Sequence, residues 1–498
     1  MKRLKKFLIV FLYFLFIFYH IPAFSEPLEK RIIEYTLKNG MKLLLLKRPY
    51  SPTVATNILF KVGSVDEITG MTGTAHLLEH MLFKGTEILG TRDYEKEKSL
   101  LDKMDKIAMQ LDNENKKGIK ADRDLIERLK NDLRKVQEEH QKFVVKDEFA
   151  SIYSKHGGIG YNAGTSRDVT SYVISLPSNK VELWTAIESD RMKNPVLREF
   201  YSERDVVMEE RRMSYDNDPE GSLFENFVAA AYSAHPYRVP TIGWMSDIRF
   251  LHKKKVEEFL KTYYAPNNCF VAVVGDIDPE KVIKMMEKYF GDIPPQNIPE
   301  RVWTEEPEQI GERRIEVEFD ANPSIVIGYH KPTLPHDDDY IFDVIDFILG
   351  SGRTSRLYKK MVEEKRIALS VHTYSMPGSR YPNLFAFNGV PRAPHTVQEL
   401  EDTFYEEVER LKNEPVSQKE LEKVINHLEA GLIRQLASNR GMSDTLTYYQ
   451  AIADDWRYMI THVDKIRKIT PEDIMNVVRK YFKKSNRTVG ILVKKEAK

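Results

Sequence analysis

The sequence has almost no cysteine and no excess of charge of either sign. Cys269 is the only cysteine among 498 residues, so no disulfide can form within the chain. Lysine and arginine total 75, as do aspartate and glutamate, which gives a formal net charge of zero. This balance argues against nucleic acid or an anionic membrane surface as the main partner. The chain is long enough for two or more domains, each stabilised by its own apolar core.

Long apolar runs are also scarce, and the candidate that stands out lies at the N-terminus. Basic residues at positions 2–6 precede an apolar run over residues 7–19, and Ala23 and Ser25 resemble a cleavage site. A run of about 13 residues is short for crossing a bilayer. Residues 1–25 are therefore predicted to be a cleaved signal peptide, with the mature protein exported to the periplasm. The alternative is a retained membrane anchor, but no stable anchor is expected.

Two stretches of the chain repeat one another without a gap. Residues 248–273 match residues 466–491, and each stretch has a helix, a short loop and a buried strand in the same register. A proline-rich stretch, residues 294–307, separates two halves of similar size. The sequence thus predicts an α+β protein of two tandem homologous domains, each an antiparallel sheet with helices. The predicted domains are residues 26–293 and 313–498, joined by a linker over residues 294–312.

A highly charged stretch over residues 99–144 interrupts the first domain. Apolar residues recur at helical spacing in two arms, and a polar break over residues 113–122 separates the arms. This pattern predicts an inserted antiparallel helical hairpin. A solvated protrusion or a packing arm is favoured over a functional role for it.

Histidine is scarce as well, with 13 residues, yet two histidines stand four residues apart within residues 73–83. Helical apolar spacing predicts a helix there, with Thr72 or Thr74 as its N-cap. On that helix His76 and His80 project from one face, where two imidazoles can hold a zinc ion. Glu79 lies beside this face as a candidate general base. The pattern is H-x-x-E-H, and the alternative is a surface helix with two unrelated histidines.

A second predicted helix offers the carboxylates that such a site lacks. Glu203 and Glu210 are two helical turns apart and share one stripe. One of them can complete a His-His-Glu zinc site, and the other can support a ligand or a substrate group. A solvated acidic face is the alternative explanation for this run.

Together these motifs resemble the pitrilysin/insulinase family of zinc metallopeptidases, in the branch of the mitochondrial processing peptidase and its bacterial relatives. The resemblance covers nearly the whole mature chain, including the duplicated halves and residues 162–165, 188–191, 349–352 and 355–358. It implies that His76, His80 and Glu210 bind one zinc ion, with Glu79 as general base and Glu203 as supporting catalytic acid. It also implies that each chain forms half of a clam-shell. A peptide substrate would lie along the strand with Asn162 and Ala163.

One position pair departs from this family's pattern. Active members carry an arginine and a tyrosine, seven residues apart, that help to bind the substrate from the C-terminal domain. Here Val362 and Leu369 stand in those places, and neither side chain can donate a hydrogen bond. Arg366 and Tyr374 lie nearby but out of register. The departure favours a heterodimer in which a family-related partner supplies the arginine and the tyrosine.

The sequence therefore predicts an exported zinc metalloendopeptidase subunit that cleaves peptides or unfolded protein segments. Three alternatives remain at this point. They are a non-catalytic core or scaffold subunit of the same fold, a self-sufficient peptidase, and a small-molecule lyase of the S-ribosylhomocysteine-cleaving type with the same zinc motif. The length and the internal duplication of the chain make the lyase remote.

Overall fold

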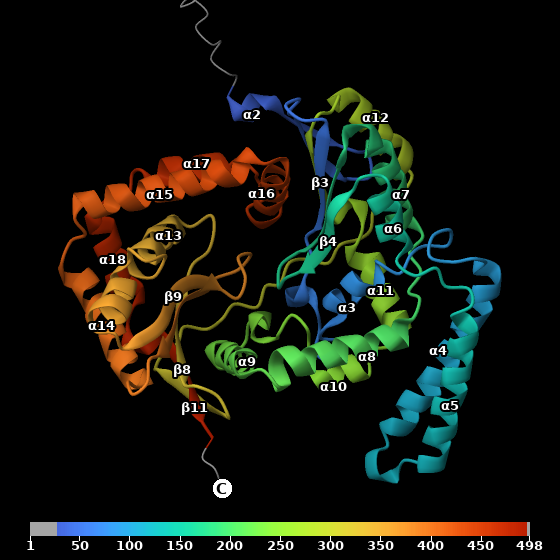
Figure 1. Ribbon diagram of the computed structural model, residues 1–498, viewed down its shortest axis with the longest axis horizontal. Helices are drawn as coiled ribbons and strands as arrows, with labels where there is room; N and C mark the ends of the chain where they lie inside the picture. Colours follow the sequence, from blue (N-terminus) through green and yellow to red (C-terminus); the bar gives the residue numbers. More distant parts are fainter. Residues whose placement is uncertain (1–26, 496–498) are drawn as a thin grey trace, which may run out of the picture.

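The computed structural model describes residues 27–495 of the chain (Figure 1). The predicted signal peptide, residues 1–25, lies outside this range. Within residues 27–495 no helix is both long enough and apolar enough to cross a membrane.

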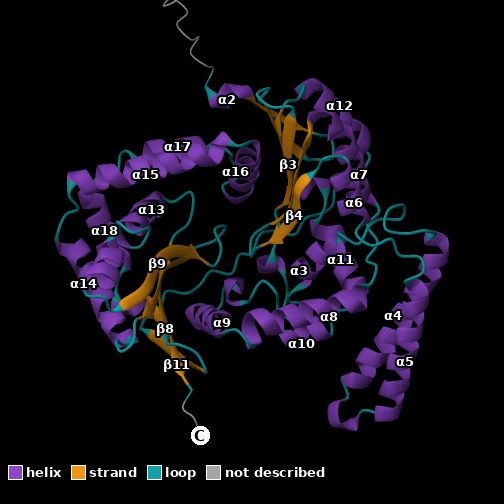
Figure 2. Cartoon of the chain, in the orientation of Figure 1, coloured by secondary structure: helices purple, strands orange, loops and turns teal. Residues whose placement is uncertain are grey.

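Two sheets form the framework of the molecule, one in each half (Figure 2). The first has the strand order β1-β2-β6-β3-β5-β4, and the second has the order β7-β11-β8-β10-β9. The strands of the first sheet are β1 (Ile32–Thr36), β2 (Lys42–Lys47), β3 (Thr53–Phe60), β4 (Ile159–Thr165), β5 (Thr170–Pro177) and β6 (Cys269–Gly275). The strands of the second sheet are β7 (Arg313–Phe319), β8 (Ser324–Lys331), β9 (Ala368–Met376), β10 (Asn383–Pro391) and β11 (Arg487–Lys494).

The two sheets share one topology, apart from the additional strand β1. In each sheet the last strand of the half, β6 or β11, pairs in parallel with one neighbour and antiparallel with the other. These strands end the two repeated sequence stretches, so the predicted α+β class and tandem duplication are confirmed. The predicted antiparallel sheets each contain one parallel pair of strands, β2 with β6 and β7 with β11. Because β6 and β11 enter their sheets after a helix rather than through a hairpin turn, each can run parallel to a neighbour.

Helices cover these sheets and connect the two halves (Figure 1). The helices of the first half are α2 (Leu28–Arg31), α3 (Thr74–Met81), α4 (Tyr94–Asn115), α5 (Arg123–His140), α6 (Glu148–Lys155), α7 (Val181–Lys193), α8 (Phe200–Arg211), α9 (Pro219–Ala231), α10 (Met245–Arg249), α11 (Lys253–Tyr263) and α12 (Pro279–Phe290). Those of the second half are α13 (Asp337–Leu349), α14 (Val397–Asn413), α15 (Gln418–Ala437), α16 (Asn439–Ile452), α17 (Tyr458–Ile466) and α18 (Pro471–Tyr481).

The two halves exchange one helix each. α9 packs against β7 and β11 of the second sheet, where Phe227 joins a buried cluster with Val326 and Leu492. Reciprocally, α16 packs against β3 and β6 of the first sheet, and Leu446 joins a cluster with Leu44. Burial of large apolar side chains on both sides stabilises this arrangement, at roughly 25 cal/mol per Å² of apolar surface removed from water. The exchange ties the two halves together.

The inserted hairpin consists of α4 and α5, which lie side by side and extend away from the rest of the molecule (Figure 1). Each helix begins with an aspartate N-cap, Asp93 for α4 and Asp122 for α5, whose side chain accepts a backbone N–H from the first turn. A small apolar cluster at the base of the hairpin includes Leu101, Met104 and Val136. The hairpin is thus packed at its base, and the loop at its tip, residues 115–120, is exposed.

Candidate metal centre

α3 starts at a loop that a buried carboxylate organises. The N-cap is Gly73, with φ +87°, and the backbone N–H groups of Gly73 and Ala75 donate to Glu67 at 2.8 and 2.7 Å. The prediction that Thr72 or Thr74 caps this helix is wrong. Both hydroxyls donate elsewhere, to Asp247 and to a backbone carbonyl, whereas one carboxylate satisfies two free N–H groups at once.

The structure brings His76 and His80 of α3 together with Glu210 of α8. Nε2 of His76 lies 3.7 Å from one carboxylate oxygen of Glu210, and Nε2 of His80 lies 3.6 Å from the other. One ligand atom from each of the three residues lies within 4.8 Å of the other two. The two histidine–glutamate distances are longer than an ordinary hydrogen bond. Three donor atoms therefore surround one point without bonding to each other.

Glu203 supports His80 from the side opposite Glu210. One of its oxygens lies 2.9 Å from Nδ1 of His80, and Lys84 forms an ion pair with the other oxygen at 2.6 Å. Burial opposes the charge on Glu203, but the bonds to His80 and Lys84 prevail and lower its pKa to about 2. Glu203 is therefore a carboxylate at neutral pH. Its bond to Nδ1 directs Nε2 of His80 toward Glu210.

The two histidines differ in their electrostatic surroundings. Burial, together with the neighbouring His80, lowers the pKa of His76 to about 4, so that imidazole is neutral near pH 7. Burial also disfavours the charged form of His80, but the bond to Glu203 and the surrounding carboxylates outweigh it and raise the pKa of His80. The neutral imidazole of His76 has a lone pair that can bind a metal ion. His80 faces three carboxylates, whose negative charge favours a metal cation beside it.

Glu79 lies on α3, next to His80 in the sequence and near the end of β4. Burial raises the pKa of its carboxyl group, while Thr165 at the end of β4 and His80 partly oppose this shift. A general base works best when its pKa lies near the pH of the reaction, so a raised pKa suits Glu79 to this role at neutral pH. Thr165 thus lies close to the predicted base, at the end of the strand that carries Asn162 and Ala163.

β4 is the edge strand of the first sheet, so one of its sides is unpaired among the described strands. Asn162 pairs with Val173 and Ala163 with Tyr172 on β5, which leaves the opposite side of β4 open. Asn162 is exposed and Ala163 is half-buried. An extended peptide can add to an edge of this kind through backbone hydrogen bonds.

The four C-terminal positions singled out from the sequence lie around β9. Leu369 on β9 is 54% exposed, and Val362 lies in a short helical turn, Tyr358–Glu364, packed against the core of the second half. Arg366 has a left-handed backbone, with φ +54°. Tyr374 packs near Phe224 of α9, and burial raises the pKa of its hydroxyl group. Leu369 and Val362 thus place no hydrogen-bond donor on this part of the second half.

A cavity of about 560 Å³ adjoins the metal centre. Glu79, His80 and Glu203 line one side of it, and residues 144–147, which follow the inserted hairpin, line another. Sequence reasoning missed this segment because nothing in its composition marks it. It also missed Glu67, which caps α3 from the preceding loop, and Lys84, whose pairing with Glu203 requires that α3 and α8 meet.

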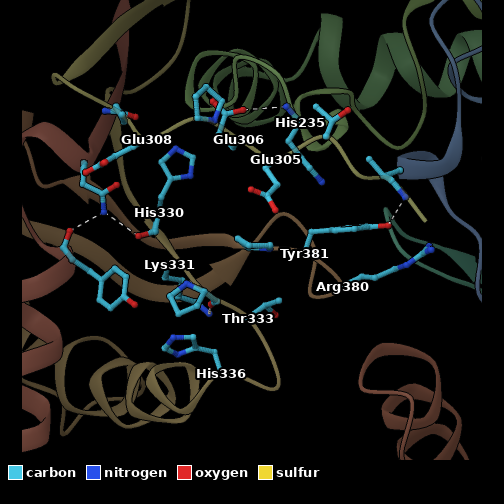
Figure 3. A pocket seen from close by; sticks show the side chains of 18 of the residues that line it. His235, Glu305, Glu306, Glu308, His330, Lys331, Thr333, His336, Arg380 and Tyr381 are labelled. Carbon is cyan, nitrogen blue, oxygen red and sulfur yellow. Dashed lines mark hydrogen bonds between the residues drawn. The ribbon is translucent and has the colours of Figure 1, made fainter. Parts of the chain in front are cut away.

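A second cavity, of about 830 Å³, lies away from the metal centre, between residues 301–309 and the second sheet (Figure 3). His235, His330 and Tyr381 are among its lining residues. The carboxylate of Glu306 accepts the backbone N–H groups of residues 233–235 at 2.7 to 3.0 Å and so fixes the linker against the first half. None of the predicted site residues lines this cavity.

Two family models match the chain and together cover most of it. The model described as insulinase, peptidase family M16, matches residues 42–113 and 128–243. The model described as the peptidase M16 inactive domain matches residues 251–428. The residues of the candidate metal centre all fall within the first match.

Similar proteins agree with these models. The zinc protease PqqE of Helicobacter pylori is 28% identical over 467 residues, which is 92% of this chain and 91% of that protein. The crystal structure of a protease from Helicobacter pylori has a TM-score of 0.77 at 27% identity and covers 93% of this chain and 99% of that one. The periplasmic protease PqqL from Escherichia coli has a TM-score of 0.68 at 17% identity, over 93% of this chain but only 48% of PqqL.

The fold and the sequence matches define the class as the zinc proteases of the M16 type, which have a two-domain clam-shell fold. This chain belongs to the pitrilysin/insulinase family.

Proposed function

We propose that the chain is the zinc-bearing subunit of a metalloendopeptidase that hydrolyses peptides or unfolded protein segments. The observation that carries this proposal is the convergence of His76, His80 and Glu210, with Glu79 beside them. Its family relatives are named zinc proteases.

The donor set fits zinc. Two imidazole nitrogens and one carboxylate oxygen are the protein ligands of a catalytic His-His-Glu zinc site, in which a fourth position stays open. Zinc bonds of about 2.0 to 2.2 Å in a tetrahedral arrangement separate the ligand atoms by about 3.3 to 3.6 Å. The separations of 3.6 and 3.7 Å between the histidine nitrogens and Glu210 are close to this range. His76, His80 and Glu210 would hold one zinc ion per chain.

A bound zinc ion would supply Lewis acidity toward the scissile carbonyl and toward water. Glu79 takes a proton from the attacking water and transfers one to the leaving amine, the usual role of a general base that then acts as an acid. Glu203 keeps His80 oriented and remains ionised throughout, since its pKa is held at about 2. The residues of α3 and α8 would thus bind the metal, transfer the proton and orient His80.

The substrate would bind as an additional strand along β4. The open side of β4 lies at Asn162 and Ala163, and the same strand ends at Thr165 beside Glu79. A peptide that adds to this edge passes next to the predicted base. Backbone pairing accepts many sequences, which suits a peptidase acting on unfolded segments.

We further propose that the chain acts with a family-related partner. Val362 and Leu369 lack the donors expected from the second half, and this chain spans about half of PqqL, whose first half has also been solved separately. The partner would supply an arginine and a tyrosine. A core subunit without activity is the competing candidate, because the second half matches the inactive domain model.

We also propose that residues 1–25 export the chain to the periplasm.

The test is the variant Glu79→Gln, which removes the base but keeps all three ligands. It is expected to retain zinc and fold normally, while hydrolysis of an unstructured peptide falls at least about a hundredfold. The wild-type chain and the variant are assayed separately, each with the same candidate partner subunits. Turnover close to wild type by Glu79→Gln would refute the assignment of the base.

A further inference from the structure

In α8 a glutamate is followed directly by an arginine twice, at Glu203-Arg204 and at Glu210-Arg211, seven residues further on. This spacing puts the two acids on one stripe of the helix and the two arginines on a neighbouring stripe. The acids reach His80, whereas the arginines are buried, with 8% and 4% of their surfaces exposed. Since buried arginines are rare unless they are paired, they require a structural explanation.

Arg204 is held by the inserted hairpin. Its guanidinium group donates to both oxygens of Asp112 on α4, at 2.9 and 3.4 Å, and to the backbone carbonyl of Leu251 at 3.1 Å. Asp112 is only 2% exposed, on a hairpin whose sequence is highly charged. The insertion thus contributes a buried anion at the position where it meets α8.

Arg211 is held in the same manner at the other end of α8. It donates to both oxygens of Glu225 on α9, at 2.7 and 3.0 Å, and to the backbone carbonyl of Gly243 at 2.9 Å. Gly243 packs so tightly against the start of α3 that an added Cβ would lie 2.4 Å from the backbone nitrogen of Gly73. Through Gly243, Arg211 connects the end of α8 to the beginning of the helix that carries the two histidines.

Glu203 is held by His80 and Lys84, whereas Glu210 has little else to fix it. The side chain of Glu210 is 41% exposed, and its carboxylate accepts no hydrogen bond within the described part of the chain. Its position therefore follows from the position of the α8 backbone. Apolar contacts alone allow a helix to shift slightly. A planar guanidinium group that donates to a carboxylate and a carbonyl together fixes both the distance and the angle between the helix and its neighbours.

We propose that Arg204 and Arg211 are positioning residues for α8: Arg204 fixes it against the inserted hairpin through Asp112, and Arg211 fixes it against the start of α3 through Gly243. The proposal rests on the proposed zinc site, because the quantity that it controls is the placement of Glu203 and Glu210. The insertion is then part of the metal centre's framework, in addition to being a protruding arm.

Two variants test this. Asp112→Leu combined with Arg204→Met removes the pair without leaving a buried unpaired charge, a change that folded proteins often tolerate. Arg204→Lys keeps the positive charge but loses the planar guanidinium group. It provides a second variant to measure if the double variant does not fold. The control is Asp132→Ala with Lys135→Ala, which removes an exposed ion pair from α5 of the same hairpin.

The readouts are the zinc dissociation constant of the folded protein, measured by competition with a chelator, together with kcat and KM. The double variant is expected to bind zinc about 10- to 100-fold more weakly, the loss seen when groups that orient metal ligands are removed. Its kcat should fall with little change in KM, Arg204→Lys should show a smaller effect in the same direction, and the control should match wild type. The inference is overturned if the folded variants bind zinc within about twofold of wild type, even if they melt earlier. A wild-type chain that binds no zinc would instead refute the proposed function.

Discussion

At the scale of single residues, Asp346 on α13 is a half-buried residue outside the proposed site, with one carboxyl oxygen buried. Its Oδ1 atom has no hydrogen-bond partner among the described residues, and burial raises its pKa from 3.8 to about 7. Between these values the folded protein holds a proton that the unfolded chain has released. The unfolded state then binds fewer protons, so the contribution of Asp346 to the free energy of unfolding falls as the pH rises from 4 to 7.

Asp346→Asn is therefore expected to raise the melting temperature more at pH 8 than at pH 4. The amide keeps the shape of the side chain and has no charge to bury. Thermal unfolding of both proteins at the two pH values measures the difference. An equal effect at both pH values would show that Asp346 does not titrate in this range in the folded protein.

At the scale of elements, the loop between β9 and β10 joins the second half to the loop that precedes α3. Arg380 donates to both oxygens of Asp66, at 3.1 and 3.2 Å, and both side chains are nearly buried. The backbone N–H groups of Ser379 and Arg380 donate to Asp168 at 2.6 and 3.2 Å. The hydroxyl of Tyr237 also donates to Asp168, at 2.6 Å. The junction of the two halves is thus a polar network that includes the residue next to Glu67.

Arg380→Ala is expected to lower the free energy of unfolding by about 3 to 5 kcal/mol, because it leaves a buried carboxylate without its partner. The double variant Arg380→Met with Asp66→Leu should lose less, since no charge remains unpaired. Urea unfolding of the three proteins provides the comparison. If the single variant is no less stable than the double variant, the ion pair does not stabilise the junction.

At the scale of the whole molecule, the proposed heterodimer follows from what the second half lacks. Two hydrogen-bond donors aimed at the developing oxyanion contribute about 3 kcal/mol each in other hydrolases. With Val362 and Leu369 in their places, the isolated chain is expected to bind zinc and cleave poorly. Adding a family-related partner that carries the arginine and the tyrosine should restore cleavage. Peptide hydrolysis with and without candidate partners measures this, and full activity of the chain alone, unchanged by any partner, would contradict it.

The duplicated α+β fold was predictable from the sequence because its repeat ends in two buried strands of equal register. The spacing of His76 with His80, and of Glu203 with Glu210, was equally visible, since each pair lies on one helix. The contact between those helices was not, because no local pattern records which faces of two distant segments meet. Glu67 was missed for a related reason: nearby threonines satisfy the local rule for an N-cap, yet a carboxylate from the preceding loop takes the role.

The exchange of α9 and α16 between the halves was also invisible in the sequence. Their apolar faces predict that each helix is buried, but not against which sheet. The boundary drawn through residues 294–312 therefore separates the two sheets along the chain while the helices cross it in space.

The central claim is that His76, His80 and Glu210 bind zinc, and metal analysis of the purified chain tests it most directly. Wild type is expected to contain about one zinc per chain. His80→Ala, which removes one of the three ligands, should contain almost none after dialysis, and circular dichroism should show that it remains folded. A folded His80→Ala protein that still holds one zinc per chain would show that the zinc is bound elsewhere.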